Sequence, residues 1–368
     1  MSLRKGSNLI AGTQDVAQQL IATGSAGSAN PVSSVAVNAA LSVRDAEIAE
    51  LGEVKVPLVG KGINLLDNWY FPNPVNQRGQ NSYNTNGAYS IDRWKFYTSA
   101  AAPVYVLSTG LKPDATAISS GAPYLEQIVE DYNCIPGKTY TFSALAVDGT
   151  DTSAAIWYLR VQATVNGTLQ NLAASINTEL GLKSITFTIP SGASVLRVHI
   201  GVYTGRFVTV SAAKLELGDT QTLARNIGTE ANPQWVLNDP APNYQQELAK
   251  CQRYLLVLNP DGKAYAIVGT GDAATATEAH FWAPVPNPIR LTSNQPIMTY
   301  TGNWRICDSV PGTGVRKGVT GMSLELGASC ASMVMIKATV ASGLTVGGFY
   351  ELQASNDVAA RIIISSEL

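Results

Sequence analysis

The chain has 368 residues, a formal net charge of −2, and 14% charged residues against 45% hydrophobic ones. The near-neutral charge argues against nucleic acid as a partner, because such binding depends on clustered Lys and Arg. No secretory signal and no apolar run long enough to cross a membrane is visible, so we expect no membrane partner. With 32 Gly and 18 Pro, the composition favours short strands joined by turns, and the length suits two domains plus an extension. We therefore predict a mostly β protein.

Residues 1–59 are predicted to be an N-terminal attachment segment. Residues 1–31 mix short apolar pairs with Gly, Ser and Asn, a composition that cannot bury enough surface to fold alone. A helix is predicted over residues 33–51, followed by a linker. Its coiled-coil-like seam, spaced by four and three, is formed by Val37, Leu41, Arg44, Ile48 and Leu51. Two alternatives stay open for this helix: association into a trimer, or a single amphipathic helix lying against the neighbouring domain.

Residues 60–220 are predicted to form a first β-sandwich of the jelly-roll kind. The segment 64–79 opens it, where Trp69 and Phe71 lie among Asn, Pro and Gly, and we expect both rings in the core. The polar segment 221–243 is predicted to be a linker. The strand segments are 88–97, 104–108, 124–129, 139–147, 155–165, 184–189, 195–202 and 208–217.

Several motifs in order along the chain resemble tail-fibre and minor structural proteins of tailed bacteriophages and prophages. In the first domain they read NLLDN, NPVNQRG, YSIDRW, YLEQ, PGKTYTFSA and AKLELG. Towards the other end they read YQQELAKCQRY, FWAPVPNPIR and AARIIISSEL. The resemblance implies a carbohydrate-binding-module-like jelly roll, then a C-terminal β-sandwich head domain over residues 244–368 that begins with a short helix.

The resemblance also implies a function. It implies a receptor-binding protein of the virion tail that attaches the particle to bacterial surface polysaccharide or cell-wall glycan without catalysis. Other tail or baseplate proteins would bind the N-terminus, and the chain would form a homotrimer. Two alternatives are a tail-associated glycan depolymerase and a purely structural tail connector.

The sequence carries no common catalytic motif, since GxSxG, HExxH and phosphate loops are all missing. A glycosidase needs only two carboxylates, which distant strands could supply. The nearest acidic group, Glu126, Glu130 and Asp131, is interpreted as solvated. His199 lies in an apolar strand and is interpreted as a packed or hydrogen-bonded residue rather than a catalyst.

The cysteines show no metal-binding spacing. They are scattered without a CxxC pair or a neighbouring His pattern, so we expect free thiols, no metal site and no cofactor. The four positions are Cys134, Cys251, Cys307 and Cys330.

Candidate ligand contacts are aromatic residues, because sugars stack on flat rings while amides and carboxylates bind their hydroxyls. In the first domain, alternation predicts that at least one of Trp157 and Tyr158 faces outward. In the C-terminal domain we expect receptor recognition on loops near residues 264–282 and 300–316, with an exposed turn at 269–272. The alternative for each aromatic is a core or trimer-interface position. The C-terminal candidates are His280, Trp282, Tyr300, Trp304 and Asp308.

Overall fold

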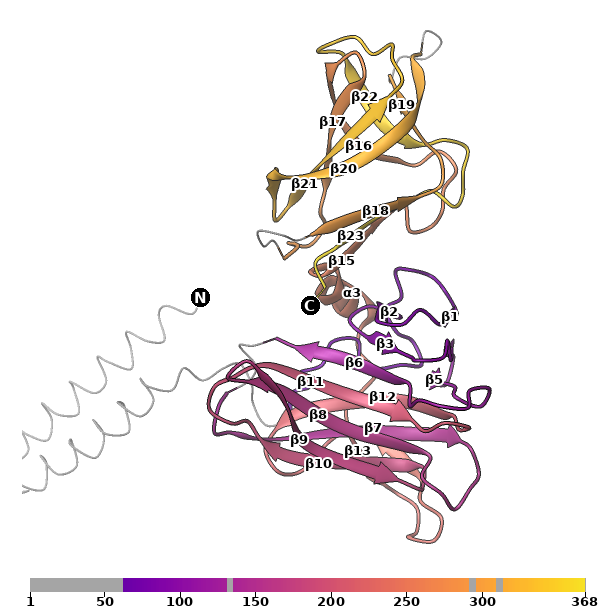
Figure 1. Ribbon diagram of the computed structural model, residues 1–368, viewed down its shortest axis with the longest axis vertical. Coiled ribbons are helices and arrows are strands. Elements are labelled where there is room, and N and C mark those ends of the chain that lie inside the picture. Colours follow the sequence, from indigo (N-terminus) through magenta and orange to yellow (C-terminus); the bar gives the residue numbers. More distant parts are fainter. Residues whose placement is uncertain (1–61, 131–134, 291–295, 309–313, 368) are drawn as a thin grey trace, which may run out of the picture. The chain divides into compact units, whose positions relative to one another are not determined.

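The computed structural model describes residues 62–130, 135–290, 296–308 and 314–367 (Figure 1). The predicted attachment segment 1–59 and its helix over 33–51 lie outside the described residues. In the described part, the chain is mostly β, and its one helix is α3 (Tyr244–Gln252). Val59–Leu368 forms one compact unit.

The first part of this unit is a sandwich of two six-stranded antiparallel sheets. Sheet A has the order β1 (Ser82–Tyr83), β4 (Val104–Leu107), β5 (Gly110–Pro113), β12 (Val208–Leu217), β7 (Thr139–Gly149), β10 (Gly181–Thr188). Sheet B has the order β2 (Ala88–Tyr89), β3 (Lys95–Tyr97), β6 (Tyr124–Val129), β11 (Ala193–Val202), β8 (Trp157–Val165), β9 (Thr168–Asn177).

Successive side chains along a strand point to opposite faces of the sheet, so every second side chain enters the core. In β11, Leu196, Val198 and Ile200 enter the core between the sheets, while Arg197 and His199 take the opposite side. The opening segment joins the same core, since Trp69 and Phe71 are 7% and 0% exposed. Both rings are therefore core residues, as the sequence predicts.

The segment predicted as a linker, 221–243, contains a hairpin of β13 (Ala224–Asn226) and β14 (Trp235–Leu237). Leu223 is fully buried in the core of the sandwich, and Trp235 packs against that core. Apolar side chains at the two ends of this hairpin thus attach it to the first domain.

The C-terminal part begins with α3, whose first turn is capped by the side chain of Asn243. A three-stranded sheet follows, in the order β15 (Leu255–Leu258), β23 (Arg361–Ser365), β18 (Ile297–Thr301). Six further strands close into a barrel in the order β16 (Ile267–Thr275), β17 (Glu278–Pro284), β21 (Met333–Val340), β20 (Arg316–Cys330), β19 (Trp304–Cys307), β22 (Phe349–Ala354).

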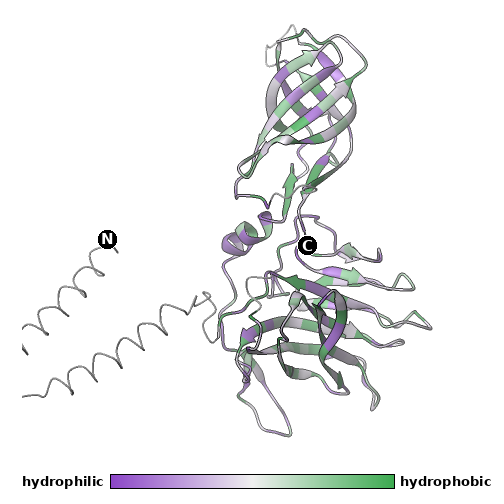
Figure 2. Ribbon diagram, turned by 60° about the vertical axis from the view of Figure 1, so that its left-hand side comes forward, coloured by the Kyte–Doolittle hydropathy of each residue, from purple (hydrophilic) through white to green (hydrophobic). Residues whose placement is uncertain are grey.

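The barrel corrects the expectation of a second β-sandwich. β22 pairs with β19 on one side and with β16 on the other, so one sheet closes on itself. Register shifts within β16 and β20 increase the local twist that closure needs. Hydrophobic and hydrophilic residues alternate along these strands (Figure 2), a pattern that a sandwich and a barrel share.

The predicted turn at residues 269–272 lies inside β16. Its glycines serve close packing instead of a turn: a Cβ on Gly271 would lie 1.7 Å from the carbonyl oxygen of His280 on the neighbouring strand. A glycine in a strand marks such close approaches as well as bends, which the sequence alone does not distinguish.

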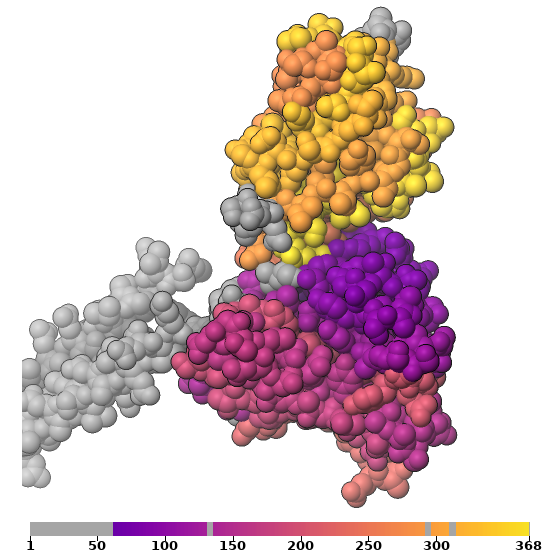
Figure 3. All heavy atoms as spheres, viewed as in Figure 1, coloured from indigo at the N-terminus to yellow at the C-terminus, as the bar shows by residue number. Residues whose placement is uncertain are grey.

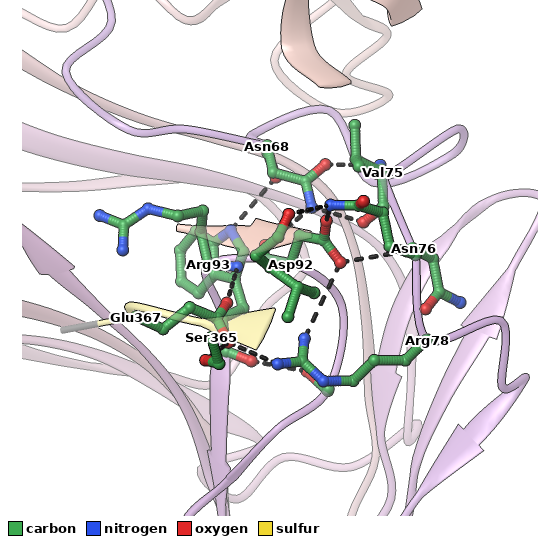
Figure 4. A network of polar contacts seen from close by, with 12 residues as sticks. Asn68, Val75, Asn76, Arg78, Asp92, Arg93, Ser365 and Glu367 are labelled. Atoms are coloured by element: carbon green, nitrogen blue, oxygen red, sulfur yellow. Dashed lines mark hydrogen bonds and ion pairs between the residues drawn. The ribbon is translucent and has the colours of Figure 1, made fainter. Parts of the chain in front are cut away.

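A network of polar contacts connects the sandwich to the C-terminal part (Figure 4). The backbone N–H of Asn68 donates to Glu247 of α3 at 2.9 Å, and the backbone N–H of Arg93 donates to Glu367 at 3.0 Å. In the space-filling view, indigo atoms of the first described residues lie against yellow atoms near β23 (Figure 3). We call this set the polar junction; it comprises Asn68, Arg78, Asp92, Arg93, Glu247, Tyr254 and Glu367.

Candidate functional site

The outer side of sheet B carries an organised group of aromatic and charged side chains. Along β6, β11 and β8, successive side chains point alternately into the core and away from it. The side chains that point away are mostly polar or aromatic. The antiparallel register places His199 opposite both Glu126 and Arg160. We call the set the tyrosine face; it comprises Lys95, Tyr97, Tyr124, Glu126, Tyr158, Arg160, Arg197 and His199.

A chain of two hydrogen bonds lies at its centre. Arg160 Nε donates to His199 Nδ1 at 2.9 Å, and His199 Nε2 lies 2.9 Å from Glu126 Oε2. Because Arg160 can only donate, Nδ1 of the imidazole is the acceptor, and Nε2–H donates to the carboxylate. Burial lowers the pKa of His199, although the hydrogen bond to Glu126 opposes this, so the ring is neutral near pH 7.

Glu126 corrects the expectation of a solvated carboxylate, because it is only 5% exposed. Burial alone would raise its pKa. The hydrogen bond from His199 and the charges of Arg197 and Lys95 outweigh burial, so the pKa of Glu126 is lowered. The carboxylate therefore stays ionised and holds the surrounding donors in place.

Three rings form a stack across neighbouring strands. Tyr97 and Tyr124 have ring centroids 5.0 Å apart at 17°, and Tyr124 and His199 have centroids 4.7 Å apart at 22°. Gly87 also lies near Tyr97, since a Cβ there would be 3.6 Å from the ring. The side chain of Tyr97 is hydrogen-bonded to Glu126 and that of Tyr124 to Arg160, so the stack and the hydrogen-bond chain form one connected group.

The guanidinium of Arg160 lies between two tyrosines. Its carbon is 5.2 Å from the ring centre of Tyr124 and 5.6 Å from that of Tyr158. Tyr158 lies over Gly201, where a Cβ would be 2.1 Å from its ring. The missing side chain at Gly201 therefore makes room for Tyr158, and burial raises the pKa of Tyr158 to about 12.

Replacing Gly201 with Ala should displace the Tyr158 ring from this position. We expect the free energy of unfolding to fall by about 1–3 kcal/mol, the usual cost of overpacking. The measurement is urea unfolding of Gly201→Ala, Tyr158→Ala and the double variant. In the Tyr158→Ala background the Gly201→Ala cost should vanish; the same cost in both backgrounds would show that the ring is not what the added methyl group meets.

The two aromatic candidates of the first domain lie on opposite sides of β8. Trp157 is fully buried in the core, and its indole N–H donates to the carbonyl of Glu179 at 3.0 Å. Its ring is thus enclosed by the sandwich. Tyr158 is 8% exposed and belongs to the tyrosine face.

The C-terminal candidates are dispersed. His280 and Trp282 share the outer side of β17, where Trp282 is 38% exposed and His280 lies 2.9 Å from the carboxylate of Glu278. Asp308 accepts from the backbone N–H of Val315 at 3.1 Å. These residues do not form one site with each other in the described part of the chain.

Among the described C-terminal candidates, Tyr300 and Trp304 line one hollow. Trp304 is 3% exposed and packs in the barrel core, with its indole N–H bound to the carbonyl of Thr301. Tyr300 is 40% exposed. The two residues contribute to a hollow of about 400 Å³, whose other lining residues are Gly302, Asn303, Gly318, Val319 and Ser355.

Sequence reasoning missed most of the tyrosine face. The alternation in residues 195–202 separates Arg197 and His199 from their apolar neighbours, which is a usable signal for one strand. The pairing of His199 with Glu126 and Arg160 depends on the register of three strands, which the sequence does not state.

No group of three or more His, Cys, Asp or Glu residues in the described ranges has a geometry that could hold a metal ion. No helix there is long and apolar enough to span a membrane.

Comparisons with known proteins complete the description. No protein-family model and no curated protein matches the chain. Solved structures with a similar region include the C-terminal family 22 carbohydrate-binding module of Clostridium thermocellum Xyn10B, at 15% identity and a TM-score of 0.26, covering 42% of this chain and 98% of that one. TmCBM61, solved with β-1,4-galactotriose, has 15% identity and a TM-score of 0.28, covering 43% of this chain and 100% of that one.

A third similar structure is the enzymatically active domain of bacteriophage CBA120 tailspike protein 4. It has 13% identity and a TM-score of 0.27, and the similarity covers 42% of this chain and 22% of that one. The similar structures are thus carbohydrate-binding modules and a phage tailspike domain, all at low identity. At these scores, the similarities assign neither a ligand nor an activity to this chain.

Proposed function

We propose that this chain is a non-catalytic glycan-binding protein and that the tyrosine face is its binding surface. The observation that carries the proposal is the fixed hydrogen-bond chain through Arg160, His199 and Glu126, placed on an outward sheet surface beside partly exposed tyrosines. Side chains held in one arrangement lose little freedom when a ligand binds. Hydroxyl and guanidinium groups suit sugar hydroxyls, which both donate and accept hydrogen bonds.

The same surface favours binding over glycoside hydrolysis. A glycosidase uses two carboxyl groups flanking the bond, and its acid needs a raised pKa. Among the eight residues that define the tyrosine face, Glu126 is the one carboxylate, and its pKa is lowered. A depolymerase would therefore need its carboxyl pair on another surface of the chain.

The biological setting of the proposal is a phage or prophage tail. The sequence resemblance supports a receptor-binding protein of the virion that attaches the particle to a bacterial surface glycan. In this proposal, residues 1–59 dock other tail or baseplate proteins, and the chain assembles as a homotrimer, which would raise apparent affinity through multiple contacts. A structural connector would bind no host surface.

Replacing Tyr124 with Ala should weaken glycan binding at least about tenfold, because the change removes a hydroxyl and the ring that supports Arg160. The measurement is binding of the full chain to purified bacterial surface polysaccharides. Tyr105→Ala is the matched control, since Tyr105 is a 37% exposed tyrosine of sheet A. Equal binding by both variants would contradict the assignment of the face.

Two further measurements separate the alternatives. Release of new reducing ends from a bound polysaccharide would establish a depolymerase and overturn the non-catalytic proposal. Loss of binding in Tyr300→Ala, with Tyr124→Ala unaffected, would move recognition to the hollow beside β18 in the C-terminal part.

A further inference from the structure

The tyrosine face has an excess of positive charge, although the whole chain carries a formal net charge of −2. Its charged members are Lys95, Arg160 and Arg197 against the single carboxylate of Glu126. That carboxylate is buried beside His199, whereas all three cations are partly exposed. Glu130, directly after β6, is partly exposed and is bound by the hydroxyl of Tyr254. Within the tyrosine face itself, solvent therefore meets cations rather than the carboxylate of Glu126.

The orientation of Arg160 is fixed by its neighbours. Its Nε donates to His199, and its guanidinium lies near the rings of Tyr124 and Tyr158. A guanidinium has five N–H donors, of which Arg160 uses some for His199 and for the hydroxyl of Tyr124, and the others can bind further acceptors. Carboxylate and phosphate oxygens are favoured acceptors for guanidinium N–H groups.

Arg197 lies on the same side of the sheet as Arg160. It is two residues before His199 on β11, and His199 is directly opposite Arg160 on β8. Diagonal neighbours of this kind are about 7–8 Å apart at their Cα atoms. Arg197 Nη1 donates to Thr164 Oγ1 at 3.1 Å, and Thr164 lies along β8 on the side of Arg197 away from Arg160. The two guanidinium groups therefore present positive charge at separate places on this face, and each attracts anionic groups of a ligand.

We propose that the tyrosine face selects glycans that carry oxyanions, with Lys95, Arg160 and Arg197 supplying the positive charge and the tyrosine hydroxyls binding neighbouring sugar hydroxyls. The inference rests on the proposed glycan-binding function and adds the chemical class of the ligand. Carboxylates of acidic sugars and phosphates of phosphorylated glycans share this chemistry. Charge-assisted hydrogen bonds are roughly twice as strong as neutral ones, so the anion should contribute a large share of the affinity.

The test uses the full chain and a panel of purified bacterial capsular and wall polysaccharides, each in three forms. One form is native, the second has its carboxylates reduced to alcohols, and the third has its phosphates removed. We expect at least about tenfold weaker binding after one of the two treatments, and the treatment that weakens binding identifies the anion. Raising the salt concentration should weaken binding of the native form more than that of the treated form.

Single substitutions test whether the cations of the tyrosine face cause the preference for the native polysaccharide. Arg197→Gln and Lys95→Gln should each reduce the preference for the native form, while Lys138→Gln removes an exposed positive charge in the turn before β7 and should leave it unchanged. Equal binding of native and treated forms would overturn the oxyanion selectivity and leave the glycan-binding function standing. Equal effects of all three variants would show a nonspecific charge effect and would also overturn it. Binding to no member of the panel in any form would overturn both proposals.

Discussion

Replacing Arg93 with Ala is expected to lower the free energy of unfolding by about 3 kcal/mol, the lower end of the range for breaking a buried ion pair, because the side chain of its partner Asp67 is 24% exposed. Arg93 is 2% exposed. Its Nε donates to Asp67 at 3.1 Å, and its Nη2 donates to the carbonyl of Ile128 at 3.1 Å. The guanidinium carbon also lies 3.7 Å from the ring centre of Tyr254. The substitution removes all three contacts at once.

The measurement is urea unfolding followed by tryptophan fluorescence. Arg93→Met is the control, because it keeps the apolar stem and removes the charge. Both variants keep a side chain at the positive φ of 71° found at Arg93, so backbone strain does not differ between them. We expect Met to recover only the packing part of the loss. An unfolding midpoint unchanged in both variants would contradict a stabilising role for Arg93 in the polar junction.

The stability of the protein should fall as pH rises from about 4 to about 7, because of Asp92. This carboxyl is fully buried, and burial together with the charge of Glu367 raises its pKa from 3.8 to about 7. The folded state therefore binds the proton more tightly than the unfolded state. The stabilisation is fully present below the unfolded pKa and is lost as pH rises through the folded pKa. Three pKa units correspond to about 4 kcal/mol.

The other groups that face Asp92 shape this response. Arg78 Nη1 lies 3.8 Å from its carboxylate, Gln77 donates to both oxygens, and Tyr244 and Cys251 lie near it. Burial and the charge of Asp92 raise the pKa of Cys251, so this thiol stays neutral over the same range. The Cys251 thiol therefore does not contribute to the fall in stability, which we assign to the titration of Asp92.

The check on Asp92 is urea unfolding at about pH 5 and about pH 8. The native chain should be more stable at the lower pH. Glu367→Gln removes the facing charge and should move the decline to lower pH. Asp92→Asn should remove the decline, even though its amide meets a donor of Gln77 and lowers stability at every pH. Because the lowered pKa of His199 acts in the opposite direction over this range, the comparison is with Asp92→Asn: an equal change in stability between the two pH values in the native chain and in Asp92→Asn would refute the assignment.

Much of the sandwich could be predicted because its strands are short, mostly apolar runs separated by turns. The predicted segments 124–129 and 208–217 coincide with β6 and β12. The hairpin partner of β8, β9, was not predicted, because its residues are mostly exposed on both sides and give no apolar period. Periodicity detects a strand through what it buries, so a polar edge strand escapes it.

The barrel and the tyrosine face show a different limit. Closure depends on β22 pairing with two strands, and the hydrogen-bond chain depends on His199 facing Glu126 and Arg160. Both features depend on how distant strands pair and in which register, whereas a sequence pattern describes one strand at a time. Two of the aromatic candidates, Trp157 and Trp304, lie in cores, which was the alternative that the sequence left open for each of them.

The polar junction makes the two halves of this unit exchangeable in principle. Each half has its own apolar core, and the contacts between them include hydrogen bonds and ion pairs from a small set of side chains. A C-terminal part transplanted from another chain would need to supply counterparts of Glu247, Tyr254 and Glu367. The sandwich would supply Asn68, Arg78 and Arg93 unchanged. Recombination between relatives that keep these residues could therefore replace one half without redesigning the other.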